Sequence, residues 1–389
     1  MSGYDPAGPL PHGTVLLEAS AGTGKTHAIA ALATRYLADG EVSADRLAVI
    51  SFSRIASAEL RSRVRQRLGQ TRTLLQQAAG GGPLPESLDA TDRLLTTGSR
   101  PELLARHGHL VRAMAGLDAA TIMTIHEFCQ AMLGELGILA DQDPQAVLAE
   151  DLGMLLDQVV DDLYLARYAG APDGPPFSLA NARLLGREAV AFAEAPLVPD
   201  EAGPVVAERL RFASAARDEF AARKRRLGLF SFDDQLLRLR DSLRDATTPA
   251  AVERLRRRCQ VVLVDEFQDT DPVQWEILQR AFDGHRPLVL IGDPKQAIYG
   301  FRGADVAAYR EAVAAADEQF SLEVNHRADA PVVAGVNALF HNISLGEGIT
   351  VPPVTASHQG SRLLGPAPAP VRLRCVAGAE LLDAAAARA

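Results

Sequence analysis

Four short apolar runs stand out in the pattern of hydrophobic and polar positions, and each is followed by apolar residues at helical spacing. Runs of this length that are apolar throughout predict strands buried on both faces. The runs are Thr14–Glu18, Leu47–Phe52, Val261–Asp265 and Leu288–Gly292. Strands that alternate with helices are typical of an α/β domain, in which helices cover both faces of a parallel sheet.

A long, mostly helical stretch separates the first two predicted strands from the last two. Within it, apolar residues from Val147 to Leu163 recur at helical spacing and predict one amphipathic helix. We therefore expect a helical subdomain at about residues 138–228. It would be inserted between two parts of one α/β domain, at residues 1–137 and 229–345.

Composition narrows the class of protein. Apolar residues make up 47% of the chain and charged residues 23%, which indicates a globular protein rather than a disordered one. No apolar run is long enough to span a membrane, and the first residues lack the pattern of a signal peptide. The cysteines Cys129, Cys259 and Cys375 are far apart, as expected in a reducing compartment. These features predict a soluble cytoplasmic protein without a cysteine metal site.

A glycine-rich segment follows the first predicted strand and begins a helix, which is the context that a phosphate-binding P-loop requires. Lys25 is expected to pair with the β- and γ-phosphates of ATP, and Thr26 to offer its hydroxyl to Mg²⁺. Backbone N–H groups at the start of the helix would face the phosphates. Alanine stands where the strict motif begins with glycine. The segment consists of Ala19, Ser20, Ala21, Gly22, Thr23, Gly24, Lys25 and Thr26.

Two adjacent carboxylates, Asp265 and Glu266, end the third predicted strand. Because the carboxyl ends of parallel strands meet at one edge of a sheet, the pair would lie beside the P-loop. There Asp265 can hold Mg²⁺, and Glu266 can orient and deprotonate an attacking water. Adjacent acids are common on protein surfaces, so this pair indicates ATP hydrolysis only in combination with the P-loop.

Six further segments, in one order along the chain, resemble helicase motifs of the UvrD/Rep type of superfamily 1. The resemblance covers nearly the whole chain and implies a RecA-like P-loop fold with ATP-dependent helicase activity on DNA. The segments are Ser51–Ser53, Thr124–Cys129, Phe232–Asp234, Asp265–Thr270, Gly292–Asp305 and Asn325–Arg327.

Within this family, three segments are most similar to RecB-type subunits of exonuclease V: Glu18–Thr26, Asp269–Pro272 and Gly292–Tyr299. The resemblance implies 3′→5′ unwinding in double-strand break repair and recombination. It also implies RecC- and RecD-like partner subunits, with single-stranded DNA and duplex ends as substrates. UvrD-type and AddA-type helicases are the alternatives, although the UvrD type usually has a different pair in place of Pro294 and Lys295.

The resemblance also assigns roles to single residues near the nucleotide. Gln268 and Gln296 match glutamines that contact the γ-phosphate or its water, and Arg327 matches an arginine finger in cis. Tyr299 matches an aromatic residue on the nucleotide side. The family often has a glutamine before the P-loop strand that reads adenine. Pro11–Gly13 stands in that region here, so adenine selectivity is left open.

Contacts with DNA are expected at Phe52, Arg54, His126, Phe301 and Arg302. In the family, the Phe301 position usually carries an aromatic residue that stacks on a base. Such stacking contributes about 1–3 kcal/mol per base without reading sequence. The net charge of −9 argues mildly against a nucleic-acid partner. However, net charge is an average, and local basic surface along a track is sufficient.

Motifs V and VI of the family are not found, nor is the nuclease domain of RecB-type proteins. Residues 346–389, which include the strand-like Val371–Val376, are expected to begin a truncated second motor domain. One motor domain alone should bind ATP and hydrolyse it poorly. Two hypotheses follow: a DNA-dependent ATPase and helicase, or a truncated ATP- and DNA-binding module without autonomous helicase activity. A P-loop kinase fits poorly, because nothing resembles a lid or an acceptor site.

Overall fold

A parallel sheet forms the centre of the fold. The computed structural model describes residues 1–137, 146–149, 151–172, 174–198, 203–245, 249–297, 306–345, 349–362 and 371–372. Within these residues the sheet has seven strands in the order β1-β9-β2-β8-β7-β3-β4, with every neighbouring pair parallel. The predicted α/β class is confirmed. The strands are β1 (Ser2–Gly3), β2 (Thr14–Ala19), β3 (Leu47–Ser51), β4 (Thr121–Thr124), β7 (Val261–Val264), β8 (Leu288–Gly292) and β9 (Glu318–Leu322).

Side chains of the central strands alternate between two apolar cores, one on each face of the sheet. Leu17, Val49 and Leu263 enter the first core, whereas Leu16 and Val262 enter the second. All five are almost completely buried, which explains why the central strands are apolar at successive positions. Burying one such side chain contributes about 1.5–3 kcal/mol.

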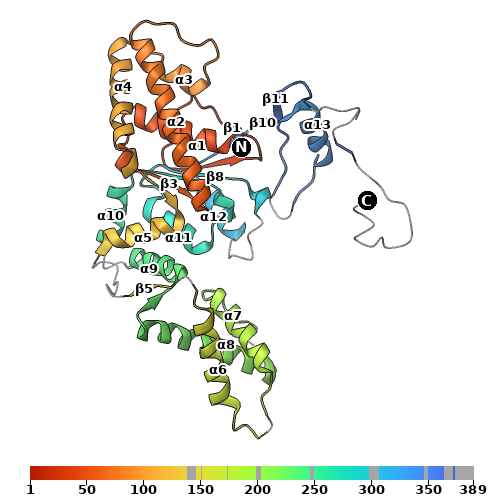
Figure 1. Ribbon diagram of the computed structural model, residues 1–389. Coiled ribbons are helices and arrows are strands. Elements are labelled where there is room, and N and C mark those ends of the chain that lie inside the picture. The colour runs from red at the N-terminus through yellow and green to blue at the C-terminus, as the bar shows by residue number, and fades with distance from the viewer. Residues whose placement is uncertain are drawn as a thin grey trace.

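Helices cover both cores (Figure 1). The first core lies against α1 (Lys25–Ala38), α2 (Arg54–Ala79), α3 (Ala90–Leu95) and α4 (Arg100–Ala115). The second lies against α5 (Ile125–Leu136), α9 (Phe232–Arg244), α10 (Pro249–Arg258), α11 (Pro272–Phe282) and α12 (Val306–Ala315).

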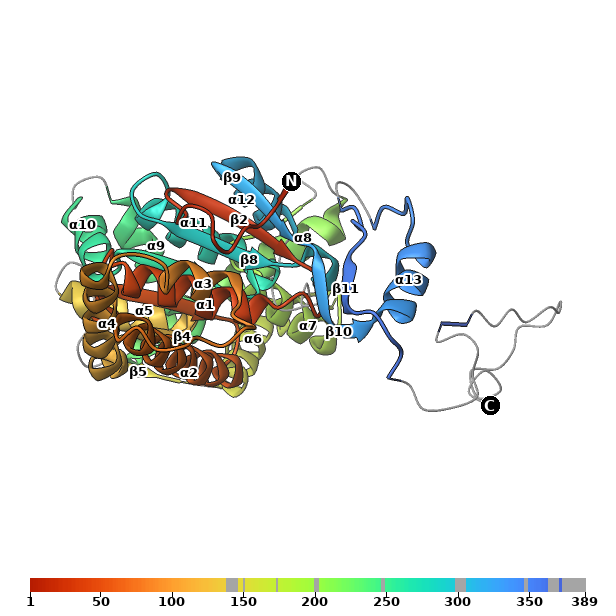
Figure 2. The same ribbon diagram turned by 90° about the horizontal axis from the view of Figure 1, so that it is seen from above.

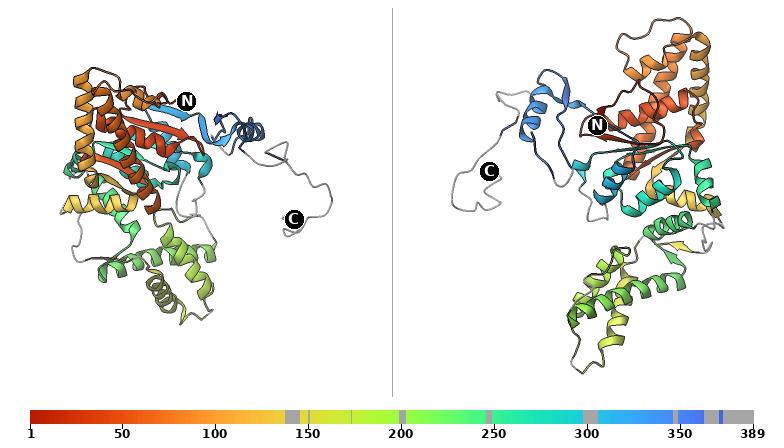
Figure 3. Two further views of the ribbon diagram at one scale, coloured as in Figure 1. Left: turned by 45° about the horizontal axis from the view of Figure 1, so that its top comes forward. Right: turned by 180° about the vertical axis from the view of Figure 1, so that it is seen from behind.

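A group of helices lies apart from the sheet and has an apolar core of its own (Figures 1 and 3). It comprises α6 (Gly153–Tyr168), α7 (Leu179–Ala191) and α8 (Pro204–Arg226). Phe212, which is fully buried, lies at its centre, with its ring centroid 5.6 Å from that of Phe177. The exact bounds of the helical subdomain stay a prediction.

The helix predicted from Val147 to Leu163 is wrong at its start, because α6 begins at Gly153. The first two residues instead form β5 (Val147–Leu148), which pairs in parallel with β6 (Leu229–Phe230). The Val147 N–H donates to the Gly228 carbonyl at 2.7 Å. Periodicity alone does not distinguish a short apolar strand from the end of a helix, so only the long-range pairing decides between them.

Three strands of the sheet are absent from the sequence prediction. β4 is short and runs directly into α5, whereas β1 and β9 lie at one edge of the sheet. Along β9 the polar side chains of Glu318, Gln319 and Ser321 interrupt the apolar pattern. Two predicted strands also end one residue early, at Ser51 and Val264.

The last described elements lie beside the sheet rather than within it (Figure 2). β10 (Val324–Asp329) pairs in parallel with β11 (Thr355–His358), next to α13 (Ala330–Leu339). The predicted strand-like Val371–Val376 falls outside the described residues except at positions 371–372. Among the helices that are described, none has the length and apolar character needed to cross a membrane.

Candidate active site

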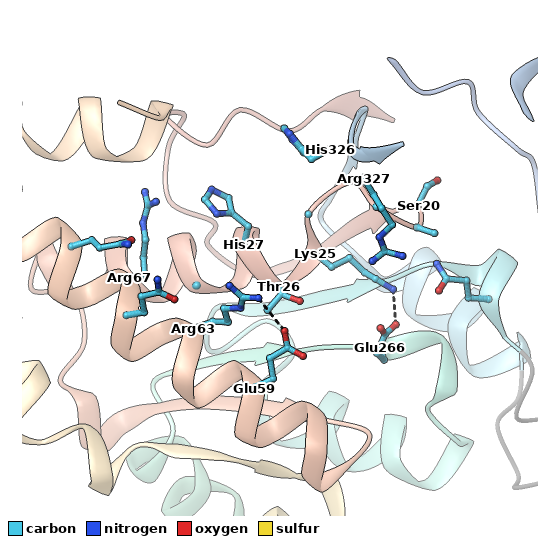
Figure 4. Close-up of a pocket in the computed structure, with 17 residues that line it drawn as sticks. Ser20, Lys25, Thr26, His27, Glu59, Arg63, Arg67, Glu266, His326 and Arg327 are labelled. Carbon is cyan, nitrogen blue, oxygen red and sulfur yellow. Dashed lines mark hydrogen bonds and ion pairs between the residues drawn. The ribbon is translucent and has the colours of Figure 1, made fainter. Parts of the chain in front are cut away.

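A cavity of about 590 Å³ opens beside the carboxyl ends of the central strands (Figure 4). Its wall is formed by the loop after β2 and by side chains of α1 and α2. Residues that follow β7 and β8, and residues of β10, complete it. Most of the predicted nucleotide-site residues are therefore brought together. Those in the wall are Ser20, Ala21, Gly22, Gly24, Lys25, Thr26, Glu266, Gln296 and Arg327.

The loop between β2 and α1 has the backbone shape of a phosphate cradle. Gly22 and Gly24 have φ of 83° and 92°, in the left-handed region that favours glycine. The Thr23 N–H and hydroxyl both donate to the Ser20 carbonyl, at 3.1 and 2.7 Å, and close the turn. Gly24 directly precedes α1, so the unpaired N–H groups of the first helical turn lie at the cavity wall. Ala19 and Thr23 support this loop without lining the cavity.

Lys25 and Glu266 form an ion pair across the cavity, with 2.6 Å between Nζ and Oε2 (Figure 4). They follow β2 and β7, which are separated in the sheet only by β8. Glu266 has a φ of 51°, a left-handed conformation that costs a non-glycine residue about 1–2 kcal/mol. The chain therefore turns sharply as soon as β7 ends, and the Glu266 carboxylate faces the P-loop.

The two aspartates nearest Glu266 are perturbed by burial. Burial and the charge of Glu266 raise the pKa of Asp265 to about 7 and the pKa of Asp269 to about 6. Within the described residues, Oδ1 of Asp265 is buried without a hydrogen-bond partner. An unsatisfied buried carboxylate oxygen is costly unless a proton or a cation joins it. Asp265 therefore has the free oxygen ligand that Mg²⁺ prefers.

Asp265 does not line the large cavity. With Phe52 and Glu266 it lines a much smaller one behind it. In the part of the chain that the structure describes, no three His, Cys, Asp or Glu residues group closely enough to hold a metal ion. A Mg²⁺ ion at Asp265 would therefore also need oxygen ligands from phosphate and water, as is usual for this ion.

The two predicted glutamines differ in position. Gln296 lines the cavity, and its Nε2 donates to Asp293 Oδ2 at 2.6 Å. Gln268 lies behind Glu266 and does not line the cavity. Its Nε2 donates to Glu266 Oε2 at 2.7 Å, and its Oε1 accepts from the Asp293 N–H at 2.9 Å. Gln268 thus contacts the candidate catalytic base rather than the open cavity.

The segment from Asn325 to Arg327 closes the cavity from the side of β10. The Asn325 side-chain amide donates to the Ala21 carbonyl at 2.9 Å, and the His326 N–H donates to the Gly22 carbonyl at 2.8 Å. Arg327 points into the cavity near Lys25 (Figure 4). From the sequence, Arg327 is expected to be an arginine finger, whereas Asn325 is only part of the motif. The contact of Asn325 with the P-loop has no local sequence signal, because it joins residues at opposite ends of the domain.

A polar face of α2 extends the cavity away from the P-loop. Glu59, Arg63 and Arg67 lie on this face, together with His27 of α1 (Figure 4). None of these four is among the predicted site residues, although the spacing of four between Glu59, Arg63 and Arg67 indicates that they share a face of α2. Arg67 is not free to bind a ligand. It is mostly buried, with 8% exposed, and forms ion pairs with Asp89, just before α3, and with Asp92 in α3.

The predicted DNA contacts Phe52, Arg54 and His126 lie at the same edge of the sheet but outside the large cavity. Phe52 follows β3, and Arg54 begins α2 with its Nε 3.3 Å from Glu127 Oε1. His126 packs edge-on against Phe232, with ring centroids 5.7 Å apart, and burial lowers its pKa. Three further predicted site residues, Tyr299, Phe301 and Arg302, lie outside the described residues.

Residues 6–316 match the family model described as the UvrD/REP helicase N-terminal domain. The chain is 44% identical over 383 residues to the RecBCD enzyme subunit RecB of Mycolicibacterium smegmatis, covering 97% of this chain and 34% of that protein. The subunit of the same name from Escherichia coli is 29% identical over 458 residues, covering 84% of this chain and 38% of that protein. The chain thus spans about a third of the length of the curated relatives it matches. The resemblance inferred from the motifs is confirmed.

Proposed function

The chain belongs to the UvrD/REP helicase N-terminal domain family, and we propose that it forms the ATP-driven motor of a RecB-type DNA helicase. The ion pair between Lys25 and Glu266 carries the proposal. It joins a phosphate-binding lysine to a candidate catalytic base across one cavity, at the edge of a parallel sheet where ligands bind. Membership of the family implies ATP and a divalent metal ion.

In this proposal, an entering triphosphate replaces Glu266 as the partner of Lys25. Lys25 then neutralises charge on the β- and γ-phosphates, and the N–H groups at the start of α1 donate to phosphate oxygens. Glu266 is released from its ion pair but stays hydrogen-bonded to Gln268. Its free carboxylate oxygen can then orient and deprotonate the attacking water.

Asp265 and Thr26 would hold Mg²⁺ in this site. The unpartnered Oδ1 of Asp265 and the position of Thr26 in the cavity wall support this assignment. When bound, the ion would supply positive charge to the phosphate oxygens and orient them for displacement.

Charge that develops on the γ-phosphate needs further donors. Arg327 lies in the cavity wall near Lys25, and its planar fork of N–H groups suits the equatorial oxygens of a transferring phosphoryl group. Gln296 lies in the same wall and can donate to phosphate or accept from water. Tyr299 is proposed to lie on the nucleotide side, from the resemblance alone.

Single-stranded DNA is the proposed track. We assign contacts with it to Phe52, Arg54, His126, Phe301 and Arg302, since aromatic and basic side chains bind single strands without reading sequence. From the motif resemblance, the chain would act in double-strand break repair and recombination with 3′→5′ polarity. RecC- and RecD-like partners are proposed because its relatives are named as RecBCD enzyme subunits.

ATP hydrolysis with and without single-stranded DNA tests the proposal, on the chain and on its Lys25→Ala variant. DNA-stimulated turnover that disappears in the variant would support a motor. Binding of ATP and DNA without turnover would favour the second candidate, a binding module that lacks autonomous helicase activity. A chain that binds no ATP would contradict both.

A further inference from the structure

Lys295 forms a buried ionic cluster behind the active-site cavity. Its Nζ lies 2.6 Å from Glu18 Oε1 and 2.8 Å from Asp293 Oδ1. The side chains of Lys295 and Glu18 are each 11% exposed, and that of Asp293 is 2% exposed. Removing one partner from a buried cluster of this kind is strongly destabilising, because it leaves uncompensated charge. The single ammonium therefore holds two carboxylates that would otherwise repel each other.

The cluster joins two elements that carry the active site. Glu18 lies in β2, directly before the P-loop, and opposite Gly292 of β8 in the sheet. Lys295 lies in the short helical turn η5 (Pro294–Gln296), which also carries Gln296. The ion pair thus ties the base of the P-loop to the turn that presents Gln296 to the cavity.

Asp293 connects Lys295 to residues around the nucleotide. Its Oδ1 takes the Lys295 ammonium, and its Oδ2 accepts from Gln296 Nε2 at 2.6 Å. Its backbone N–H donates to Gln268 Oε1, and Gln268 in turn donates to Glu266. The orientation of one carboxylate therefore sets the position of Gln296 directly, and its backbone supports Gln268.

Tyr309 of α12 belongs to the same buried environment. It is 5% exposed, and its hydroxyl has no hydrogen-bond partner within the described residues. Burial raises the pKa of Tyr309, and the charges of Glu18 and Asp293 raise it further, so the phenol stays neutral beside the carboxylates. A water-poor environment of this kind strengthens the attraction between Lys295 and its two partners.

We propose that Lys295 and Glu18 are positioning residues for ATP hydrolysis, which hold Asp293 in the orientation that presents Gln296 to the γ-phosphate. The inference rests on the proposed ATPase function. Lys295 does not line the cavity, so it acts through Asp293 and not by touching the nucleotide. Without the ammonium, Asp293 would turn away from Glu18, and Gln296 would lose its hydrogen-bond partner.

Steady-state ATP hydrolysis by Lys295→Met in the presence of single-stranded DNA tests this role. We expect kcat to fall by about tenfold or more, the usual effect of losing a charge-assisted hydrogen bond, and the KM for ATP to rise by a smaller factor. Lys295→Arg should recover most of the loss, because it keeps the charge. Lys224→Met is the matched control, since Lys224 of α8 is 12% exposed and lies 2.7 Å from Asp234 of α9, while it does not line the active-site cavity. Equal losses in Lys295→Met and Lys224→Met would overturn the inference.

A binding experiment tests the same role without turnover. The ratio of the Kd for ADP to that for a non-hydrolysable ATP analogue measures how well the site senses the γ-phosphate. This ratio should fall in Lys295→Met and, in case that variant does not fold, in the volume-conserving Glu18→Gln. If the wild-type chain prefers the analogue and the variants prefer it equally, the inference is overturned, while the proposed function stands. A wild-type chain that binds neither nucleotide would overturn the proposed function, and the inference with it.

Discussion

The side-chain amide of Asn325 donates to the Ala21 carbonyl at 2.9 Å, across a separation of 304 positions in the chain. This contact holds the start of β10 against the P-loop. The neighbouring His326 N–H makes a second one by donating to the Gly22 carbonyl. The phosphate cradle is therefore shaped from two sides, by its own glycines and by the start of β10. Space around Gly22 is correspondingly small.

Replacing Gly22 with alanine should disable the cradle. The added Cβ would lie 2.9 Å from the Arg327 Cβ and 3.0 Å from Asn325, at a φ of +83° that alanine disfavours. We expect affinity for ATP to fall by about tenfold or more, since left-handed backbone alone costs about 1–2 kcal/mol. Gly81→Ala is the control, because Gly81 has a φ of +70° with nothing within 4 Å of the added Cβ. Titration with a fluorescent ATP analogue measures both, and a similar loss in the two variants would contradict the crowding argument.

Glu266→Gln should separate ATP binding from ATP hydrolysis. The amide cannot take a proton from water, so turnover should fall by about a hundredfold or more. ATP should bind at least as well as in the wild type, because Lys25 loses the competing carboxylate that now lies 2.6 Å away. Nucleotide titration and phosphate release on one preparation measure the two effects. A parallel loss of binding and turnover would contradict the role assigned to Glu266.

The raised pKa of Asp265 should make stability depend on pH. Its folded pKa of about 7, raised by burial and by Glu266, exceeds its ordinary value of 3.8. The folded protein therefore holds a proton that the unfolded chain releases. This contribution to stability is fully present below about pH 4 and is lost as pH rises through about 7.

Thermal unfolding of the metal- and nucleotide-free chain between pH 5 and pH 8 measures this effect. The Tm of the wild type should fall over that range by several degrees more than the Tm of Asp265→Asn, which has no proton to lose. Asp269→Asn should remove a smaller part of the dependence, since the pKa of Asp269 is raised to about 6. Asp45→Asn, at an exposed position, is the control. Identical pH profiles for Asp265→Asn and the wild type would rule out Asp265 as the source.

The separate core of α6, α7 and α8 should allow the helical part to unfold while the nucleotide site persists. Phe212→Ala removes a fully buried ring and should cost this core about 3–5 kcal/mol. Hydrogen exchange should then accelerate across the three helices. Affinity for ATP should be nearly unchanged, because distant sites behave independently. Phe192→Ala, at a ring that is 42% exposed, is the control. Loss of ATP binding together with the helices would show that the two parts form one cooperative unit.

Much of the fold could be predicted because the central strands lie between two layers of helices. Burial on both faces requires apolar residues at successive positions, and this pattern is visible in Leu288–Gly292 without any knowledge of its neighbours. Strand β9, which lies next to the two-residue edge strand β1, was missed for the converse reason. Its side chains are mostly only partly buried, so polar residues are tolerated and no apolar run forms.

The sequence by itself determined the chemistry of the candidate site. Two local features carry this chemistry: the glycines with Lys25 in the P-loop, and the carboxylates that directly follow β7. Each can be recognised from neighbouring residues, because a tight turn requires glycine and a buried strand requires an apolar run. Tertiary structure alone decided which of these groups meet. The order β2-β8-β7 brings Lys25 to Glu266, and the return of the chain at β10 brings Asn325 to Ala21.

Which charged side chains form ion pairs was also decided only by the tertiary structure. Sequence shows that Arg61, Arg63, Arg65 and Arg67 gather on one helix, but not which of them are free. In the folded chain Arg65 and Arg67 are paired with aspartates far along the sequence. Local sequence patterns indicate which positions are buried and which backbone conformations they adopt. Ion pairs and hydrogen bonds between distant segments depend on how strands and helices are ordered in space, and that order is decided only when the whole core packs together.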